Sequence, residues 1–188
     1  MTQLRAPATA SPTTPAGAPQ MLHHVTYVTY DSAATTDFYT RIMRMPLVAT
    51  VMDDHLPSTG DRTPYFHTFF RLGDGSTLAF FESPGLPVRA PDPHPAFDNF
   101  NHLALAVATK DDVDAWKAWL EENEIEVLLV DHKIIYSIYF HDPNGVRLEI
   151  TTTVVPGWDA DEAGAAASLD EWVVAKQRAA ESGTGSDE

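Results

Sequence analysis

The sequence predicts an α+β fold in which two βαβββ modules form a half-open barrel around a metal site. Two observations carry this prediction. Residues 21–155 contain an internal repeat, because HVTYVT from His24 aligns with HLALAV from His102. Each copy continues with a helical pattern, a β-branched run and a hairpin in the same order. We therefore expect two modules, at 21–82 and 100–155, that pair their sheets and enclose a cavity.

The first repeat begins with alternating residues from His24 that favour a half-buried strand. Phe38 and Ile42 follow at the i, i+4 spacing of one buried helix face. The run LVATVM predicts a second strand, and residues 65–81 predict a hairpin that turns at Gly73–Gly75. These elements complete the first βαβββ module.

The second repeat has matching elements in the same order. His102 begins a strand, Trp116 and Leu120 mark a helix face, and IEVLLV is a β-branched run. Residues 135–150 predict a hairpin that turns at Asp142–Gly145. A Pro-rich connector at 83–95 joins the two modules.

Both ends of the chain differ in composition from the repeat. Residues 1–20 are mostly Ala, Pro, Thr, Ser and Gly, so we expect a disordered tail. Residues 156–188 form an acidic C-terminal segment, in which Ser168 and Glu171 resemble a capping box at the start of a helix near 168–181. The short apolar stripe of this helix predicts packing on the outside of the domain or on a partner, such as the second subunit of a homodimer.

Composition excludes several classes of function. The chain has no cysteine, which excludes disulfides, cysteine-ligated zinc and thiol nucleophiles. The net charge of −15 disfavours nucleic acid as a partner. No apolar run approaches the roughly 18 residues of a membrane span, and the N-terminus has no signal-peptide pattern. We expect a cytoplasmic protein without a membrane partner.

Strand alternation predicts which side chains face the cavity. Leu103 and Leu105 form the apolar core face of their strand, which directs His102 to the opposite face. By the same alternation Glu149 faces the cavity from the last strand, and the repeat transfers the position of His102 to His24. Two imidazoles and one carboxylate suit a divalent metal. We therefore predict that His24, His102 and Glu149 bind Fe(II), with Mn(II) as the alternative.

The same alternation places aromatic side chains on the cavity face of the first module. Tyr65, Phe69 and Phe81 are predicted to bind a flat, apolar substrate. His67 lies among them and has a pKa range suited to moving protons. Tyr139 belongs to the corresponding face of the second module.

Three segments carry a family resemblance: HHVTYVTYDSAATTDFY, NHLALAV and YFHDPNGVRLEI. They resemble the paired-module motifs of the vicinal oxygen chelate superfamily. This superfamily contains glyoxalase I, methylmalonyl-CoA epimerase, fosfomycin-resistance enzymes, bleomycin-binding proteins and type I extradiol dioxygenases. The resemblance covers residues 21–155 and implies that His24, His102 and Glu149 occupy the positions of the metal triad.

The position that would supply a fourth ligand distinguishes among these families. Glyoxalase I and the epimerase take a Glu or Gln from the last strand of the first module, where this chain has Ala79. Three protein ligands resemble the pattern of one-domain extradiol dioxygenases. In that family a tyrosine hydrogen-bonds the substrate oxygen, and Tyr139 matches its position. The family's acid–base histidine would fall near Ser76, so His67 is the expected replacement, with His94 as the alternative. His132 is the candidate for the family's second active-site histidine.

The resemblance and the residues together predict an extradiol-type dioxygenase that uses Fe(II) and O2 to cleave a catechol-like aromatic ring. Tyr139 and His67 are the expected catalytic residues. One alternative is a metal-dependent lyase or isomerase of the glyoxalase or epimerase type. Another is a protein that binds an aromatic compound without turnover.

Overall fold

The computed structural model describes residues 18–19, 21–88, 90 and 94–183 of the chain. The chain divides into two compact units, Met1–Val88 and Arg89–Glu188, and each contains one βαβββ module. The predicted α+β class and the order of elements in both modules are confirmed. The predicted tail at 1–20 lies outside the described residues, except for 18 and 19. Pairing of the two sheets into a half-open barrel stays a prediction.

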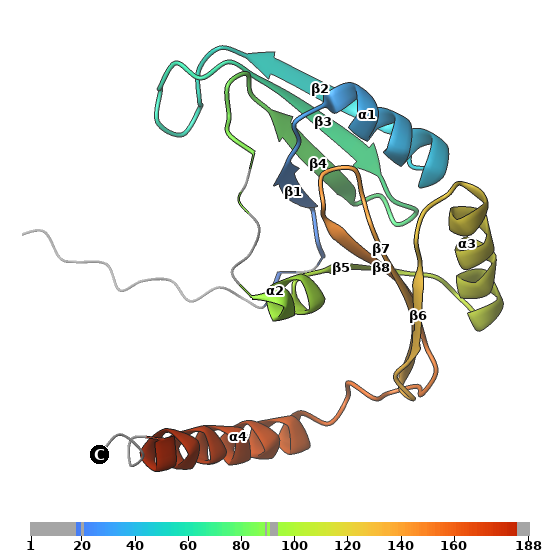
Figure 1. The fold of residues 1–188 in the computed structure, drawn as a ribbon, viewed down its shortest axis with the longest axis vertical. Helices are drawn as coiled ribbons and strands as arrows, with labels where there is room; N and C mark the ends of the chain where they lie inside the picture. The colour runs from blue at the N-terminus through green and yellow to red at the C-terminus, as the bar shows by residue number, and fades with distance from the viewer. Residues whose placement is uncertain (1–17, 20, 89, 91–93, 184–188) are drawn as a thin grey trace, which may run out of the picture. The chain divides into compact units, whose positions relative to one another are not determined.

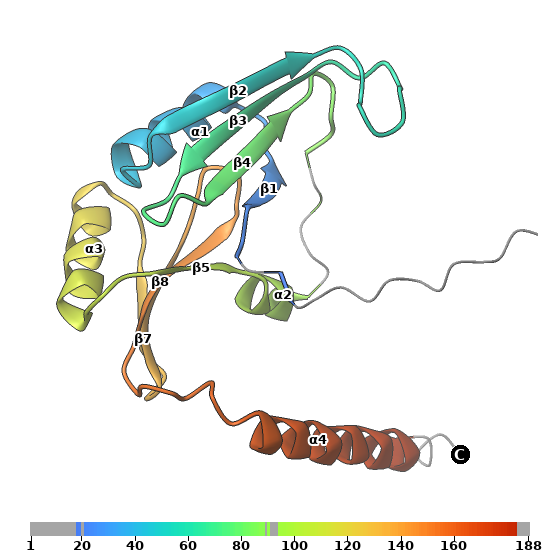
Figure 2. The same ribbon diagram turned by 180° about the vertical axis from the view of Figure 1, so that it is seen from behind.

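The first unit is a four-stranded mixed sheet with the strand order β1-β4-β3-β2 (Figure 1). Strand β1 is parallel to β4, and the other neighbours are antiparallel. Figure 2 shows β2, β3 and β4 side by side from the opposite direction. The elements are β1 (His24–Val28), α1 (Ser32–Asp37), the π-helical turn η1 (Phe38–Ile42), β2 (Leu47–Asp53), β3 (Tyr65–Arg71) and β4 (Thr77–Glu82).

The helical segment packs against one face of this sheet. The Asp31 side chain caps α1 by accepting hydrogen bonds from the first backbone N–H groups of the helix. Tyr39 is fully buried, and its ring lies 5.2 Å from Phe70 and 5.0 Å from Phe80 between ring centroids. Because side chains alternate along a strand, the residues next to these two phenylalanines face the other side of the sheet.

The second unit repeats this sheet with the order β5-β8-β7-β6, in which β5 is parallel to β8. A short helix precedes the module and a long helix follows it. The elements are α2 (Pro95–Phe100), β5 (Leu103–Ala106), α3 (Lys110–Glu122), β6 (Leu128–Asp131), β7 (Ile135–His141), β8 (Arg147–Thr153) and α4 (Glu162–Gly183).

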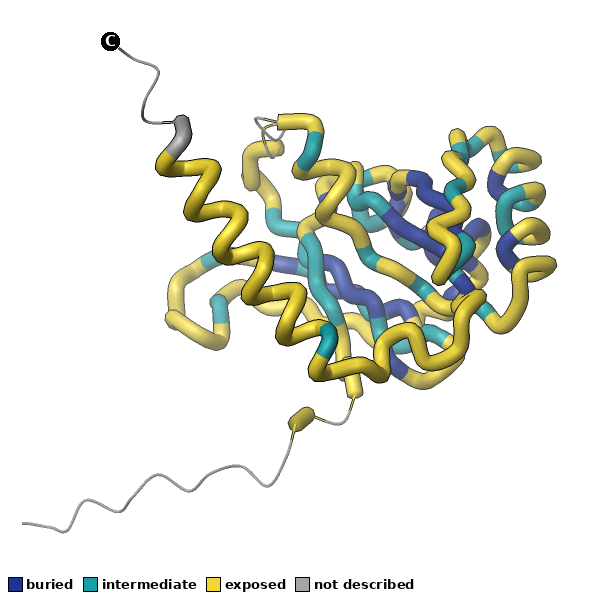
Figure 3. Tube along the Cα trace, turned by 90° about the horizontal axis from the view of Figure 1, so that it is seen from below, coloured by how far each residue is buried: buried dark blue, intermediate teal, exposed yellow. Residues whose placement is uncertain are grey.

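Helix α3 covers the apolar face of the second sheet by packing on β7 and β8. Thr109 and Asp112 form a reciprocal capping box at its start. Val113 and Leu120 are fully buried on its inner face, as are Ile138 and Leu148 on the sheet. Figure 3 shows this burial along the strands and one side of α3, whereas α4 is exposed along its length.

Two helices differ from the sequence prediction. Helix α4 begins at Glu162 and not at Ser168, because Asp161 caps it: its Oδ1 accepts a hydrogen bond from Gly164 N at 2.9 Å. Helix α2 follows the Pro-rich connector, in the interval before the second module for which no element is predicted, and Pro95 occupies its first turn. Across the described parts of the chain, no helix combines the length and apolarity needed to cross a membrane.

Candidate functional site

The strand register confirms which residues are equivalent in the two units. In the first sheet Thr26 pairs with Ala79, and in the second Ala104 pairs with Glu149. His24 lies two residues before Thr26, and His102 lies two residues before Ala104. The two histidines therefore occupy matching positions, and Ala79 stands where the second unit has its carboxylate.

Glu149 is the most deeply buried charged side chain of this region, with 2% of its surface exposed. Its Oε2 lies 2.9 Å from His102 Nε2. Its Oε1 is buried and has no hydrogen-bond partner among the described residues. A buried carboxylate oxygen without a partner is costly to the fold, whereas a cation beside it would satisfy it. The imidazole and carboxylate therefore fit a divalent metal, which takes nitrogen and oxygen ligands of these kinds.

Tyr139 lies next to Glu149 in the strand register and connects several polar groups. Its hydroxyl is 3.0 Å from His132 Nε2, and the ring of His102 meets its ring edge-on at 5.5 Å. Burial, and then the Glu149 carboxylate, raise the pKa of Tyr139 above its usual value. The phenol is therefore protonated at neutral pH, so its O–H can donate to an oxygen or to His132.

The residues predicted to face the cavity from the first unit form one continuous aromatic cluster. His67 stacks on Phe81 with ring centroids 3.6 Å apart and an interplanar angle of 6°. Phe69 lies 4.1 Å from His67, and Tyr65 meets Phe81 edge-on at 5.2 Å. His24 lies edge-on to Phe69 at 6.0 Å. The structure thus brings these five side chains of the first unit together.

His67 is held in a defined protonation state. Its Nδ1 lies 2.9 Å from the carbonyl oxygen of Phe80, an acceptor only, so Nδ1 carries the proton and donates it. Burial lowers the pKa of His67, and the nearby His24 lowers it further, although the Phe80 hydrogen bond opposes this shift. His67 is therefore neutral at pH 7, and its Nε2 keeps a lone pair that can accept a proton.

The neighbouring His23 interacts directly with His24. Their Nδ1 atoms lie 2.7 Å apart, so one of the two rings donates to the other. Both residues are exposed. This contact fixes the orientation of the His24 ring and engages its Nδ1, which leaves Nε2 as the nitrogen suited to a metal.

Two positions considered for acid–base chemistry have structural roles. Ser76 is buried, and its backbone N–H and hydroxyl both donate to Asp74 Oδ1 in the β3–β4 turn. His94 is the N-cap of α2, where its Nδ1 accepts a hydrogen bond from Ala96 N at 3.1 Å. His132 differs from both because its Nε2 faces the Tyr139 hydroxyl. The sequence alone could not distinguish the roles of Ser76, His94 and His132.

An exposed turn after β2 offers a different set of metal ligands. Oxygens of Asp53 and Asp54 and a nitrogen of His55 lie within 4.8 Å of one another. All three residues are exposed, and His55 Nδ1 is 2.7 Å from Asp54 Oδ1. Exposed acidic turns of this kind are common in proteins without a metal.

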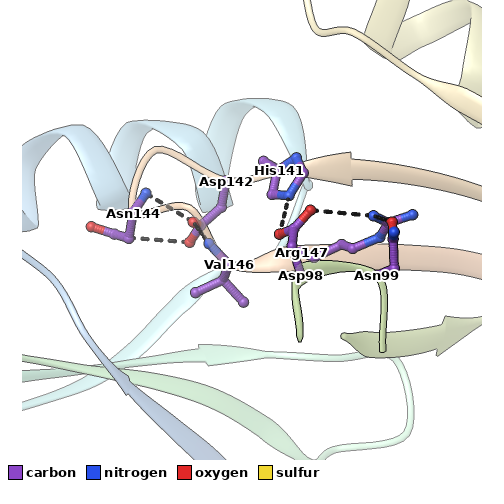
Figure 4. Close-up of polar contacts among 7 residues, drawn as sticks. All are labelled: Asp98, Asn99, His141, Asp142, Asn144, Val146 and Arg147. Atoms are coloured by element: carbon purple, nitrogen blue, oxygen red, sulfur yellow. Dashed lines mark hydrogen bonds and ion pairs between the residues drawn. The ribbon is translucent and has the colours of Figure 1, made fainter. Parts of the chain in front are cut away.

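A polar network near Glu149 was missed from the sequence (Figure 4). Arg147 Nη1 lies 2.8 Å from Asn99 Oδ1 and 3.4 Å from Asp98 Oδ2. Asp98 Oδ1 also lies 2.9 Å from His141 Nε2, and this hydrogen bond is the largest cause of the lowered pKa of Asp98. The only sequence signal was that Arg147 shares the strand parity of Glu149, because α2 itself was not predicted.

The comparisons with known proteins agree with this architecture. Residues 21–150 match the model of the Glyoxalase/Bleomycin resistance protein/Dioxygenase superfamily. The chain is 30% identical over 137 residues to the metallothiol transferase FosB of Staphylococcus haemolyticus. The aligned region covers 70% of this chain and 82% of that protein. It is 27% identical over 136 residues to the putative ring-cleaving dioxygenase MhqA of Bacillus subtilis, covering 69% of this chain and 39% of that protein.

A solved structure shows the same fold. The glyoxylase/bleomycin resistance protein/dioxygenase domain from Frankia sp. EAN1pec aligns with a TM-score of 0.59 at 17% identity. The alignment covers 72% of this chain and 99% of that domain. The repeat and its two sheets therefore have a known structural counterpart.

Proposed function

Because the chain belongs to the Glyoxalase/Bleomycin resistance protein/Dioxygenase superfamily, we propose that it is a metal-dependent dioxygenase of the extradiol type. Its substrate would be a catechol-like aromatic ring that is cleaved with O2. The observation that supports this choice is the stacked aromatic wall around a neutral His67. Such a wall suits a flat ring, and the imidazole suits removal of a hydroxyl proton.

The metal would be held by His24, His102 and Glu149, with Fe(II) as the first choice and Mn(II) as the alternative. The buried Oε1 of Glu149, which lacks a partner among the described residues, supports a cation at this carboxylate. The matching positions of the two histidines in the repeat support their joint use. Bound there, the ion would supply a Lewis acid for two adjacent substrate oxygens.

The protein's own residues would divide the remaining tasks. Tyr65, Phe69 and Phe81 would stack against the substrate ring and exclude water from it. Nε2 of His67 would accept a proton from a substrate hydroxyl, because its Nδ1 is already committed to the Phe80 carbonyl. Tyr139 would donate its hydroxyl proton in a hydrogen bond to a substrate oxygen, with His132 orienting that hydroxyl.

Metal content and O2 consumption test this proposal together. Protein purified anaerobically should contain about one iron per chain and consume O2 when catechols are added. His102→Ala should lose both the iron and the O2 uptake. His55→Ala is the matched control, since it removes an exposed imidazole from the competing acidic cluster. Iron retained in His102→Ala, or lost in His55→Ala, would contradict the assignment.

A second candidate, thiol transfer, is favoured by the relatives named metallothiol transferase, at 30% identity over 70% of the chain. It predicts consumption of a small thiol in the presence of an epoxide such as fosfomycin, without any need for O2. The cluster of Tyr65, His67, Phe69 and Phe81 in the first unit is mainly aromatic and therefore suits a flat ring better than a phosphonate. Metal binding with thiol consumption but no O2 uptake would replace the dioxygenase proposal with this one. Metal binding with neither activity would favour lyase or isomerase chemistry.

A further inference from the structure

Arg147 is a cation that the proposed metal chemistry does not use. It begins β8 on the same face as Glu149, two residues along the strand. Its side chain is only 11% exposed, and its guanidinium carbon lies 4.8 Å above the ring centroid of Tyr139. Burying a charge is costly unless it is paired, so the hydrogen-bond partner of each N–H group of Arg147 is important.

The guanidinium is held by one edge only. Nη1 donates to Asn99 at 2.8 Å and makes a longer contact of 3.4 Å with Asp98 (Figure 4). Nε is covered by the protein and has no hydrogen-bond partner among the described residues. A ligand can therefore reach this guanidinium only at its terminal nitrogens, whose N–H groups match the oxygens of a carboxylate.

A cavity of about 290 Å³ lies beside this arginine. Its polar wall contains Arg147, His141 and the hydroxyl-bearing Tyr139, and its one carboxylate is Glu126, which is exposed. The full lining consists of Glu126, Val127, Leu128, Tyr139, Phe140, His141 and Arg147. A volume of this size is at the lower end of small-ligand pockets and suits a substituent rather than a large molecule.

We propose that Arg147 binds a carboxylate substituent of the substrate through the terminal nitrogens of its guanidinium, in the cavity beside Tyr139, so that the enzyme selects acidic aromatic compounds. The inference rests on the proposed function and names the substrate class for that same site. A single carboxylate fits better than a doubly charged group, because Glu126 and Asp98 are also close to the cation. Asp98 and Asn99 of α2 are positioning residues, since they hold Nη1 of the guanidinium.

His141 contributes to the same wall from the neighbouring strand. It pairs with Arg147 in the β7–β8 register, and its Nε2 lies 2.9 Å from Asp98. Asp98 thereby links the two side chains and fixes their spacing. A substrate carboxylate would meet the terminal nitrogens of Arg147 directly, and the imidazole would keep Asp98 from moving onto them.

A binding measurement tests the inference without any turnover. Isothermal titration of the full chain should show that phenylacetate binds about 10–100-fold more tightly than phenylacetamide, its uncharged isostere. Arg147→Gln should remove this preference, and Arg147→Lys should restore only part of it. Arg71→Gln is the control, because Arg71 is an exposed strand arginine of the first unit and should leave the preference intact. Equal affinities in the wild type, or a preference that survives Arg147→Gln, would overturn the inference.

A kinetic comparison separates this inference from the proposed function. A catechol with a carboxymethyl group should have a higher kcat/KM than the catechol with the matching carboxamide. Arg147→Gln should lower kcat/KM for the acid about 10–100-fold more than for the amide, mainly through KM. Equal turnover of both compounds would overturn the carboxylate subsite while the dioxygenase stands. A carboxylate preference in binding, without O2 uptake on any catechol, would support the subsite and reject the dioxygenase.

Discussion

The two sheets share one backbone register but differ in the side chains that occupy it. In the first sheet one row across the strands is Thr26, Ala79, Phe69 and Ala49. The corresponding row of the second sheet is Ala104, Glu149, Tyr139 and Leu128. Duplication thus preserved the scaffold while the chemistry of matching positions diverged.

The two units therefore differ in the kind of polar group that they bury without a hydrogen-bond partner. At its central positions the first unit has buried Ala79 and half-buried Phe69, neither of which has a polar side-chain group. The unpaired buried side-chain atoms among its described residues are the uncharged hydroxyls of Ser32 and Thr68. The second unit buries the Glu149 carboxylate with an unpaired oxygen and the Arg147 guanidinium with an unpaired nitrogen. Buried charged groups with unpaired atoms destabilise a fold and are retained at functional sites. We therefore expect ligands to contribute more to the stability of the second unit than to that of the first.

The largest expected effect comes from exchanging the central residues. Glu149→Gln should lower metal affinity by about 100-fold or more, since it replaces a charged carboxylate ligand with a neutral amide oxygen. In the absence of metal the same variant should be as stable as the wild type or more so, because the buried charge is removed while the Gln oxygen can still accept a hydrogen bond from His102. Metal titration and urea unfolding measure the two effects. A metal affinity that is unchanged would show that Glu149 is not a ligand.

The reciprocal variant, Ala79→Glu, places a carboxylate at the fully buried matching position of the first unit. Without metal it should be destabilised by several kcal/mol, because an unpaired charge is buried. If the triad assignment is correct, added metal should recover part of that loss, and the rise in Tm on metal addition should exceed that of the wild type. An equal rise in both proteins would mean that Ala79 does not lie near the metal.

A second pair of variants tests what the units share. Leu78 and Leu148 precede the two central positions and are both fully buried on the helix-covered faces. Leu78→Ala and Leu148→Ala should each cost about 2–5 kcal/mol of unfolding free energy, since each leaves a cavity. Urea unfolding of the two variants checks this. A much smaller cost in one unit would show that its core is looser than the equal burial indicates.

The next effect concerns the hydroxyl that distinguishes Tyr139 from Phe69. Tyr139→Phe removes the hydrogen bond with His132 and should change stability by only about 1 kcal/mol. It should lower kcat about 10–100-fold, because the donor to the substrate oxygen is lost. The matched variant Phe69→Tyr adds a hydroxyl to the first unit and should not restore activity in a double variant. Full activity of Tyr139→Phe would remove this residue from the mechanism.

The smallest expected effect is the pH dependence of unfolding free energy that His67 introduces. The matching residue in the second unit, Ser137, does not titrate. Burial lowers the pKa of His67 below 6.5, so the folded state disfavours its protonation. Its contribution to stability is therefore complete above pH 6.5 and is lost as the pH falls through the lowered pKa. His67→Gln should lose less stability than the wild type between pH 7.5 and pH 5 in urea unfolding. Identical losses would show that His67 is not the responsible group.

Much of the candidate site could be predicted because strand alternation is local. The spacing of Tyr65, His67 and Phe69 placed all three on one face, and the structure brings them together with Phe81. The repeat fixed the equivalence of His24 and His102, which the register confirms. A period of two along a strand needs no knowledge of distant residues, so it can be read from the chain.

The sequence by itself therefore determined the fold class, the repeat and the face on which each strand residue lies. Only the tertiary structure decided which nitrogen of His67 carries the proton, because the Phe80 carbonyl that selects it belongs to another strand. The same holds for the network of Arg147, in which Asn99 lies 48 residues away in the sequence. Contacts of this kind depend on the direction of single side chains across long separations, which local patterns of hydrophobicity do not encode.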